Sequence, residues 1–289
     1  MKKVLLQLDT DEHPSPFDAI VAHDADVDVL LSHGNVKPEE ARALAQDAFF
    51  TRGPDDLKNT AVWVGGKRVA AGEEVFSEVQ KAFFGPFRVS VMLDSNGCNT
   101  TAATTIARIA KARSLAGSRA VVLGLGAVGL RSAALLQGEG CEVITASLPA
   151  DLFGDDRPYR RPHGLTVAEQ LGLDAREPKD RSELEALLDD AQIVLCAGPA
   201  GVQVLRRDAW AQHPSLELLA DYNAAEPLGI EATKATDDLA DYDGKVVLGA
   251  LAIGGPKMKV HKACVRRLFE SNDQVLDTDE VYAVAKELV

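Results

Sequence analysis

The most restrictive feature of the sequence is a glycine-rich turn that follows an apolar run and precedes a helical pattern. Residues 120–123 read Ala-Val-Val-Leu, and the turn after them carries Gly124, Gly126 and Gly129. Small and apolar side chains then predominate from residue 130 to 137, as in a helix that packs on a sheet. This is the GxGxxG spacing in the strand, turn and helix context that the motif requires. The chain is therefore expected to contain a Rossmann-type α/β domain.

Each glycine of this turn has a distinct physical role in a dinucleotide site. Gly124 permits the tight turn, Gly126 removes a side chain where a pyrophosphate approaches the backbone, and Gly129 lets the helix lie close to its strand. Free N–H groups at the start of the helix, at Ala127 and Val128, favour the phosphate charge. The alternative is a glycine-rich turn that serves packing only.

The end of the next expected strand, residues 142–147, bears on the choice between NADP and NAD. An NAD-selective site usually has Asp or Glu there to accept from the ribose 2′-hydroxyl, but residues 145–148 read Thr-Ala-Ser-Leu. Ser147 can bond a 2′-phosphate, and three arginines follow in a proline-rich segment: Arg157, Arg160 and Arg161. These features favour NADP, with NAD as the alternative. The competing interpretation is a surface loop whose arginines pair with neighbouring aspartates.

Later strand ends extend the expected cofactor site. A turn after the strand at 193–197 would run under the nicotinamide half of the cofactor, and another strand ends at Asp-Tyr-Asn. Because ligands bind outside the carboxyl ends of parallel strands, four residues are expected there: Ala197, Gly198, Asp221 and Asn223.

Composition narrows the partners. The formal net charge is −13, from 44 acidic and 31 basic residues, so nucleic acid and anionic membrane surfaces are poor candidates. The plainer role of this acidity is solubility. The sequence has no apolar run long enough for a membrane span and no secretory signal, so a cytoplasmic protein is expected. Its four cysteines are far apart in the sequence, which predicts reduced thiols and no metal site.

The first hundred residues alternate apolar β-type runs with helical patterns, which implies a parallel sheet. We expect two α/β domains: a substrate domain over 1–100, against which a terminal helix at 277–289 packs, and a Rossmann NAD(P)-binding domain over 101–276. The expected N-terminal strands are 3–8, 27–32, 60–64 and 87–93, and the expected helices are 17–22, 38–48 and 71–84.

Polar residues follow the fourth of these strands, where a ligand site of an open α/β sheet is expected. Asp94 and Asn96 lie in the turn, and Asn99 or Thr100 is expected to cap the next helix. All four are candidates for substrate binding. Turn and cap roles are an equally good explanation of these residue types.

A second candidate cluster follows Gly254-Gly255-Pro256, where a helix is expected to begin near Lys257. Lys257 and His261 are one turn apart on one face, whereas Lys259 points elsewhere. A lysine at a helix start opposes the helix dipole, which is a mild sign of function. His261 is a candidate for substrate binding, and a packing or hydrogen-bonding role suits it better than catalysis.

Several longer segments carry a family resemblance. They read QLDTDEHPSPFDAIVAHD, FFGPFRVSVMLDSNGCNTTAA, ADYNAAEPLGI and GALAIGGPKMKVHKACVRRLFES. The chain resembles the NADP-dependent methylenetetrahydromethanopterin dehydrogenases. The resemblance implies a two-domain α/β subunit, oxidation of a methylene-pterin to a methenyl-pterin, and homo-oligomers, trimers among them. It also implies that Lys257 faces the pterin and that Asp18 is a substrate-side acid.

The implied chemistry requires few groups. When hydride leaves the methylene carbon, the two flanking nitrogens stabilise the cation, so no general base and no metal are needed. The protein must align donor and acceptor carbons and tolerate a new positive charge, a role that suits Asp18. Two alternatives remain open: the same reaction on methylenetetrahydrofolate, and a noncatalytic NADP-binding sensor.

Overall fold

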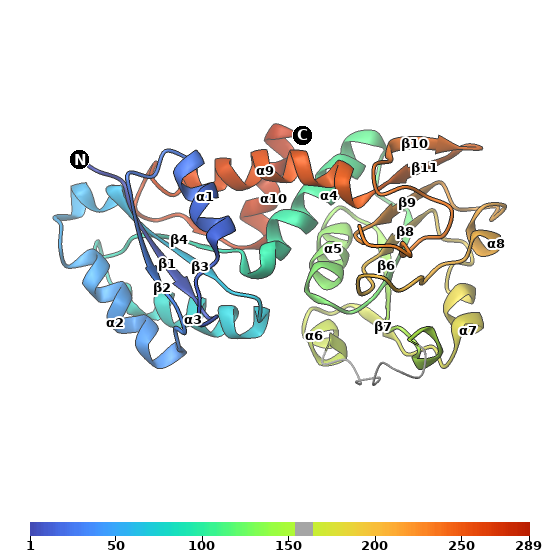
Figure 1. Ribbon diagram of the computed structural model, residues 1–289, viewed down its shortest axis with the longest axis horizontal. Coiled ribbons are helices and arrows are strands. Elements are labelled where there is room, and N and C mark those ends of the chain that lie inside the picture. The colour runs from blue at the N-terminus through green and yellow to red at the C-terminus, as the bar shows by residue number, and fades with distance from the viewer. Residues whose placement is uncertain (154–163) are drawn as a thin grey trace. The chain divides into compact units, whose positions relative to one another are not determined.

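The structure is a computed structural model of the 289-residue chain and describes residues 1–153 and 164–289 (Figure 1). The chain forms two compact units. The first unit contains Met1–Thr100 and Lys257–Val289, and the second contains Thr101–Pro256. The expected α/β class is confirmed in both units.

The first unit is built on a parallel five-stranded sheet with strand order β12-β4-β3-β1-β2. Its strands are β1 (Val4–Asp9), β2 (Val29–His33), β3 (Thr60–Gly65), β4 (Ser90–Leu93) and β12 (Val275–Leu276). Its helical segments are α1 (Pro16–Asp24), α2 (Pro38–Phe49), η1 (Pro54–Asn59), α3 (Val69–Ala82), η2 (Ser95–Gly97), α10 (Thr278–Leu288), the start of α4 (Cys98–Ala112) and the later part of α9 (Ala250–Arg267).

Side-chain alternation gives the two faces of this sheet different roles. Leu6, Leu8, Val62 and Val64 project to the face covered by α2 and α3, where they join one apolar core (Figure 1). Successive residues of a strand point to opposite faces, so the intervening residues of β1 and β3 project to the other face. The candidate site lies at the carboxyl ends of β1, β3 and β4, on the side of this second face.

The second unit contains a seven-stranded sheet with strand order β10-β11-β9-β8-β5-β6-β7. Only β10 runs antiparallel within the described sheet, against β11. The order of the six parallel strands is that of the doubly wound Rossmann fold, and the strand order reverses between β5 and β8. The strands are β5 (Arg119–Leu123), β6 (Glu142–Ala146), β7 (Asp174–Arg176), β8 (Ile193–Cys196), β9 (Leu218–Asp221), β10 (Asp238–Tyr242) and β11 (Lys245–Leu248).

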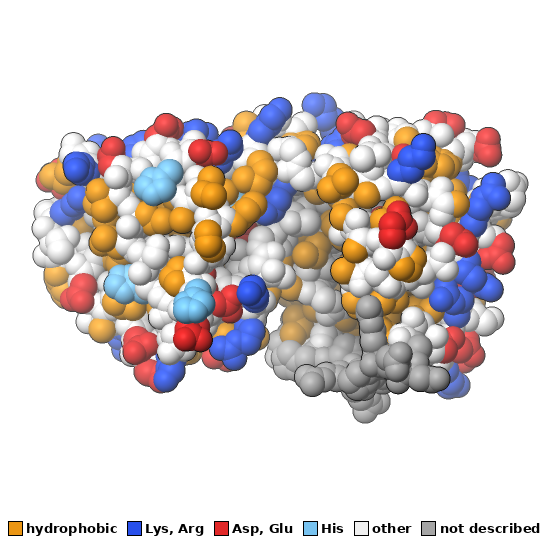
Figure 2. Space-filling model, viewed as in Figure 1, with side chains coloured by type: hydrophobic (Ala, Val, Ile, Leu, Met, Phe, Trp, Pro, Cys, Tyr) orange, Lys and Arg blue, Asp and Glu red, His pale blue; other side chains and the backbone are white. Residues whose placement is uncertain are grey.

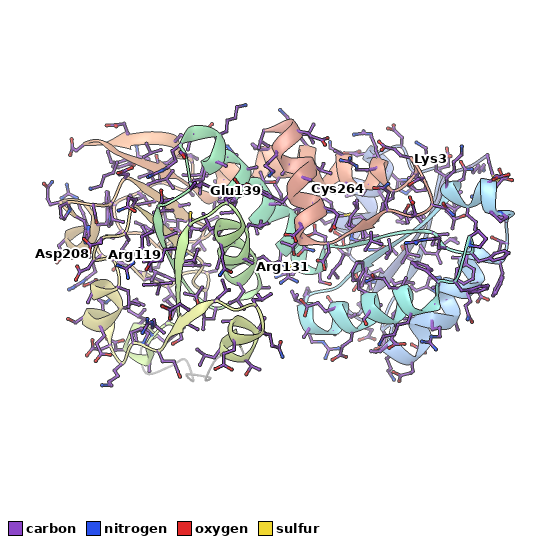
Figure 3. All side chains as sticks on the ribbon, turned by 180° about the vertical axis from the view of Figure 1, so that it is seen from behind. Lys3, Arg119, Arg131, Glu139, Asp208 and Cys264 are labelled. Atoms are coloured by element: carbon purple, nitrogen blue, oxygen red, sulfur yellow. The ribbon has the colours of Figure 1, made fainter. Side chains whose placement is uncertain are left out.

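The longest described helical segments of this unit are α5 (Ala127–Gly138) and its part of α4. The others are η3 (Ala150–Leu152), α6 (Gly164–Gln170), α7 (Arg181–Ala186) and α8 (Arg207–Trp210), together with the start of α9. Figure 3 shows Arg119 at the start of β5 and Arg131 on α5, the strand and helix that flank the glycine turn.

The division of the chain differs from the expected one at its C-terminal end. Residues 257–276, expected in the nucleotide-binding domain, belong with the first unit. Their contacts explain the difference: His261 on α9 meets Trp63 of β3, and β12 pairs with β4. The terminal helix α10 also belongs to the first unit, as the sequence suggested.

The start of α9 also differs from the expectation. The helix begins at Ala250 rather than near Lys257, and Pro256 lies inside it. Lys257 is therefore in the middle of a helix, and the argument that its charge opposes the helix dipole was wrong. The expected shared face is retained, because Lys257 and His261 are still one helical turn apart.

Three general expectations concern the surface and the cysteines. Over the described ranges, no helix has the length and apolar character needed to cross a bilayer. Within the same ranges no group of His, Cys, Asp and Glu side chains is arranged to hold a metal ion. All four cysteines are buried and none forms a disulfide, including Cys264 on α9 (Figure 3). On the face seen in Figure 2, basic side chains are scattered among acidic ones rather than gathered in a patch.

Candidate active site

Lys257 extends its ammonium group between a glycine and an aromatic ring of the first unit. Its Nζ lies 5.1 Å from the centroid of the Phe17 ring, which is a cation–π distance. Gly97 has φ +62°, and a Cβ at that position would lie 2.8 Å from Nζ. Any side chain at residue 97 would therefore displace the ammonium group.

Asp18 stands in the first turn of α1, whose start is capped by Ser15. The Ser15 Oγ accepts from the backbone N–H of Asp18 at 3.3 Å. Burial raises the pKa of the Asp18 carboxyl to about 7, and the charges of Asp94 and Asp9 act in the same direction. Lys257 opposes them and lowers this pKa. Asp18 is thus an acid that changes its charge near neutral pH.

Asp94 follows β4, and its carboxylate is committed to the start of α4. It accepts from the backbone N–H of Thr100 at 3.1 Å and from the Thr100 hydroxyl at 2.7 Å. The cap of this helix is therefore Asp94, rather than Asn99 or Thr100. Asp94 is 2% exposed, and it acts on Asp18 by raising the pKa of that carboxyl.

His261 is buried next to this carboxylate. Its Nε2 lies 3.5 Å from Asp94 Oδ2, and its ring meets the Trp63 ring edge-on at 4.9 Å. Neither ring nitrogen has a hydrogen-bond partner among the described residues. Burial lowers the pKa of His261 to about 4, more than Asp94 raises it, and Lys257 lowers it further. The imidazole is therefore neutral at pH 7 and does not form a charged pair with Asp94.

The two asparagines after β4 occupy different environments. Asn99 donates to the Leu93 carbonyl at 2.7 Å and to Asp277 at 3.1 Å, so its amide ties α4 to the start of α10. Asn96 is exposed and has φ +55°, a left-handed conformation that Asn tolerates. Of this pair, only Asn96 presents an exposed side chain, and substrate binding by either residue remains a prediction.

Sequence reasoning missed Asp9, whose carboxylate is fully buried beside the site. It accepts from the backbone N–H groups of Asp11 at 2.8 Å and Ser15 at 3.0 Å. These bonds fix the loop that leads into α1 and therefore the place of Asp18. The available signal was the position of Asp9 at the carboxyl end of the first strand, the same rule that singled out Asp94.

The three glycines of the turn in the second unit have different surroundings. Gly124 has φ +116°, and a Cβ there would lie 2.5 Å from the Ala197 carbonyl oxygen. A Cβ at Gly129 would lie 2.2 Å from the Gly124 carbonyl oxygen, so this glycine permits close packing of α5. At Gly126 a Cβ would have no described heavy atom within 4 Å. The space beside Gly126 is therefore open among the described residues, and pyrophosphate binding there, by Ala127 and Val128 at the start of α5, stays a prediction.

The end of β6 lacks an acidic side chain. Ser147 is 1% exposed, and its backbone N–H donates to the Arg176 carbonyl. The residues expected to hold a 2′-phosphate beside it, Arg157, Arg160 and Arg161, lie outside the described residues. The choice between NADP and NAD therefore depends on the absence of an acid at residues 145–148.

Asp221 and Asn223, expected near the nicotinamide, hold their own loop. Asp221 accepts from the N–H groups of Asn223 and Ile230, and the Asn223 amide bonds to Pro227 and Ala225. After β8, Ala197 contacts the glycine turn through its carbonyl, and a Cβ at Gly198 would lie 2.7 Å from the Val204 side chain. These four residues shape the strand ends, and their direct contact with a cofactor stays a prediction.

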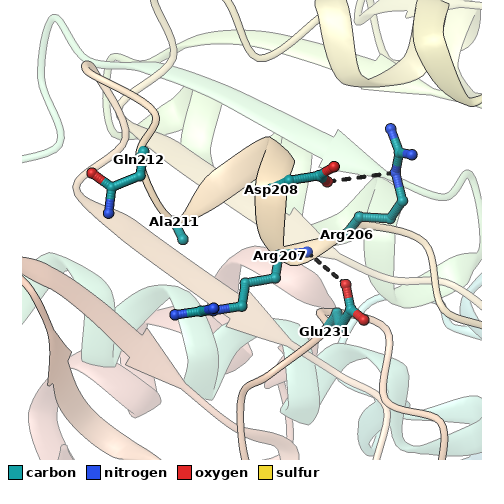
Figure 4. Close-up of a pocket in the computed structure, with 6 residues that line it drawn as sticks. All are labelled: Arg206, Arg207, Asp208, Ala211, Gln212 and Glu231. Atoms are coloured by element: carbon teal, nitrogen blue, oxygen red, sulfur yellow. Dashed lines mark hydrogen bonds and ion pairs between the residues drawn. The ribbon is translucent and has the colours of Figure 1, made fainter.

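A surface hollow in the second unit has the wrong character for this site (Figure 4). Two interactions join its lining residues: Arg206 pairs with Asp208 at 3.6 Å, and Glu231 accepts from the backbone N–H of Arg207 at 2.8 Å. None of its lining residues belongs to the glycine turn. They are Arg206, Arg207, Asp208, Ala211, Gln212 and Glu231.

Solved structures similar to the chain share its fold. A shikimate 5-dehydrogenase from Listeria monocytogenes, in complex with shikimate and NAD, has a TM-score of 0.51 at 12% identity, covering 98% of this chain and 96% of that one. An ornithine carbamoyltransferase from Pyrococcus furiosus has a TM-score of 0.50 at 13% identity, covering 91% and 83%. At these identities the likeness concerns the fold alone.

Sequence comparisons are more specific. The family described as methylene-tetrahydromethanopterin dehydrogenase, N-terminal, matches residues 16–96, which include Asp18 and Asp94. In Methylorubrum extorquens, the bifunctional protein MdtA is 44% identical over 290 residues, and an NAD(P)-dependent methylenetetrahydromethanopterin dehydrogenase is 31% identical over 303 residues. Each alignment covers 99% of both chains. The chain therefore belongs to the methylenetetrahydromethanopterin dehydrogenase family.

Proposed function

We propose that the protein oxidises methylenetetrahydromethanopterin to methenyltetrahydromethanopterin and transfers the hydride to NADP or NAD. The observation that supports this most directly is the charge set around Lys257. The titrating carboxyl of Asp18 interacts with the Lys257 ammonium group and with two buried carboxylates, those of Asp9 and Asp94. The 31% identical relative bears the corresponding activity in its name.

The charge set suits a reaction that creates a cation. Loss of hydride leaves positive charge on the carbon between two pterin nitrogens, and no proton has to be removed from that carbon. The ionised carboxylate of Asp18 stabilises the developing cation, since preorganised charges are most effective away from bulk water. Lys257 donates to polar atoms of the pterin and orients it. Asp9, Asp94 and Thr100 hold the surrounding backbone in place.

The nucleotide is assigned to the second unit. The nicotinamide ring of the bound nucleotide supplies the carbon that accepts the hydride. The Cβ-free space at Gly126 and the N–H groups that begin α5 would take the pyrophosphate. NADP is the preferred cofactor in this proposal, because no carboxylate at residues 145–148 is placed to accept from a ribose 2′-hydroxyl or to repel a 2′-phosphate.

The direct experiment is the change in NAD(P)H absorbance on mixing the protein with each methylene-pterin and each nucleotide. We expect turnover with methylenetetrahydromethanopterin and NADP. Faster turnover of methylenetetrahydrofolate would change the assigned carrier. Binding of NADP without any hydride transfer would indicate a sensor and contradict the proposal. A cytoplasmic location and a homo-oligomer, a trimer for example, are further proposals that fractionation and light scattering would test.

Gly126→Val is expected to abolish NADP binding and leave the fold intact. A Cβ at residue 126 has no described heavy atom within 4 Å, but the valine side chain would occupy the space where the pyrophosphate approaches the backbone. Gly138→Val is a matched control, because it places the same side chain in open space at the other end of α5. Titration with NADP and thermal unfolding would be measured for both variants. Unchanged NADP affinity in Gly126→Val would show that the glycine turn serves packing only.

A further inference from the structure

Gly65, at the carboxyl end of β3, is a glycine that its backbone does not require. It is the last residue of a regular strand, and it does not have a positive φ, unlike Gly66 at +105° and Gly97 at +62°. An ordinary β-strand accommodates any side chain, and glycine inside a strand often marks a close approach by another group. The reason for the missing side chain must lie in the surroundings of Gly65.

Those surroundings consist of two carboxylates. A Cβ at residue 65 would lie 3.2 Å from Asp18 Oδ2 and 3.6 Å from Asp9 Oδ2, and these are the nearest side-chain oxygens. Strand pairing explains the second contact, because Gly65 is the register partner of Asp9 in the parallel pair of β1 and β3. Asp18 reaches the same space from the first turn of α1.

We propose that Gly65 is a positioning residue for hydride transfer, whose missing side chain allows the Asp18 carboxyl group to lie beside the Asp9 carboxylate. The inference rests on the proposed function, in which Asp18 faces the developing cation. Gly65 itself would touch neither the pterin nor the nucleotide. It acts through the place and the surroundings of Asp18.

The charges around Asp18 set the direction of the effect. Asp9 is fully buried and fixed by two backbone N–H groups, so it stays in place when Asp18 moves. The other charged groups that act on Asp18 are Asp94 and Lys257. Because a Cβ at residue 65 would lie only 3.2 Å from Asp18 Oδ2, we expect a methyl group there to move the half-buried Asp18 carboxyl away from residue 65 and its neighbour Asp9, and toward water. Both changes favour the charged form, so the pKa of Asp18, about 7 in the native protein, should fall.

Gly65→Ala tests this role, with Gly53→Ala as the matched control in the same unit. A Cβ at Gly53 meets no described atom within 4 Å. For Gly65→Ala we expect kcat/KM for the methylene-pterin to fall about tenfold or more. The midpoint of its pH–rate profile should move down by about one unit or more. NADP affinity should be unchanged, because the nucleotide is assigned to the other unit, and Gly53→Ala should match the wild type in every measurement.

A double-mutant cycle separates a positioning role from a merely structural one. If Gly65 acts through Asp18, Gly65→Ala should cause almost no further loss of kcat/KM in an Asp18→Asn background. Equal losses in both backgrounds, or an unmoved pH midpoint in Gly65→Ala, would overturn the proposal.

Two further measurements cover the remaining outcomes. If Gly65→Ala does not fold, Asp9→Asn removes the neighbouring charge without added volume, and its pH midpoint must also move down for the proposal to stand. If the wild type shows no hydride transfer, the proposed function fails. NMR titration of the Asp18 carboxyl in the wild type and Gly65→Ala then still decides whether Gly65 sets its protonation.

Discussion

Lys257→Ala should lower kcat/KM for methylenetetrahydromethanopterin by about two to four decades, the scale of losing a positioning or electrostatic group. Two effects combine. The variant loses the ammonium held between Gly97 and Phe17, which orients the pterin. It also loses the positive charge that lowers the pKa of Asp18, so less Asp18 is ionised at pH 7. The variant's pH–rate midpoint should therefore lie above that of the wild type, while NADP affinity barely changes.

Lys259→Ala is the matched control for this variant. Two residues along a helix turn the side chain by about 200°, and Lys259 is exposed where Lys257 is half-buried. Steady-state kinetics with the pterin and NADP titrations of both variants make the comparison. A crippled Lys259→Ala beside a nearly normal Lys257→Ala would show that the wrong lysine has been assigned to the substrate.

Much of the fold could be predicted from local patterns. The glycine spacing identified the β5, turn and α5 segment, and the helix expected over residues 38–48 is α2, Pro38–Phe49. The prediction failed where a local rule was overridden. Pro256 was expected to mark a helix start, but it lies within α9.

The candidate site was predicted only in part. Lys257 and His261 share a face because helical spacing is a local property, and Asp94 was identified from its place after a strand. Asp9 and Gly65 could not be paired from the sequence, because these register partners are far apart in the chain and meet only when β1 and β3 align. The neutrality of His261 likewise depends on burial by Trp63 and Phe17, which lie far away in the sequence.

Asp18→Asn should lower kcat by about two decades and remove its pH dependence near neutrality. In the wild type, oxidation of the methylene-pterin should accelerate as pH rises through about 7, because the Asp18 carboxyl ionises there and the anion stabilises the product cation. Asparagine cannot ionise, so the variant's profile should be flat over this range. Rates measured from pH 5.5 to 8.5, a range of about 1.5 units on each side of that midpoint, provide the comparison.

The same substitution should stabilise the fold at high pH. The pKa of Asp18 is raised from its ordinary 3.8 to about 7, so its contribution to stability is complete below about 3.8 and is lost as pH rises through 7. Asp18→Asn should therefore unfold at a higher temperature than the wild type at pH 8, with the difference shrinking toward pH 4. Asp24→Asn, which alters an exposed acid on the same helix, should show neither effect.

If Asp18→Asn kept the wild-type pH–rate profile, a different group would carry the charge that the reaction needs. A gain in stability with a loss of activity would show that Asp18 is retained for catalysis at a cost to the fold.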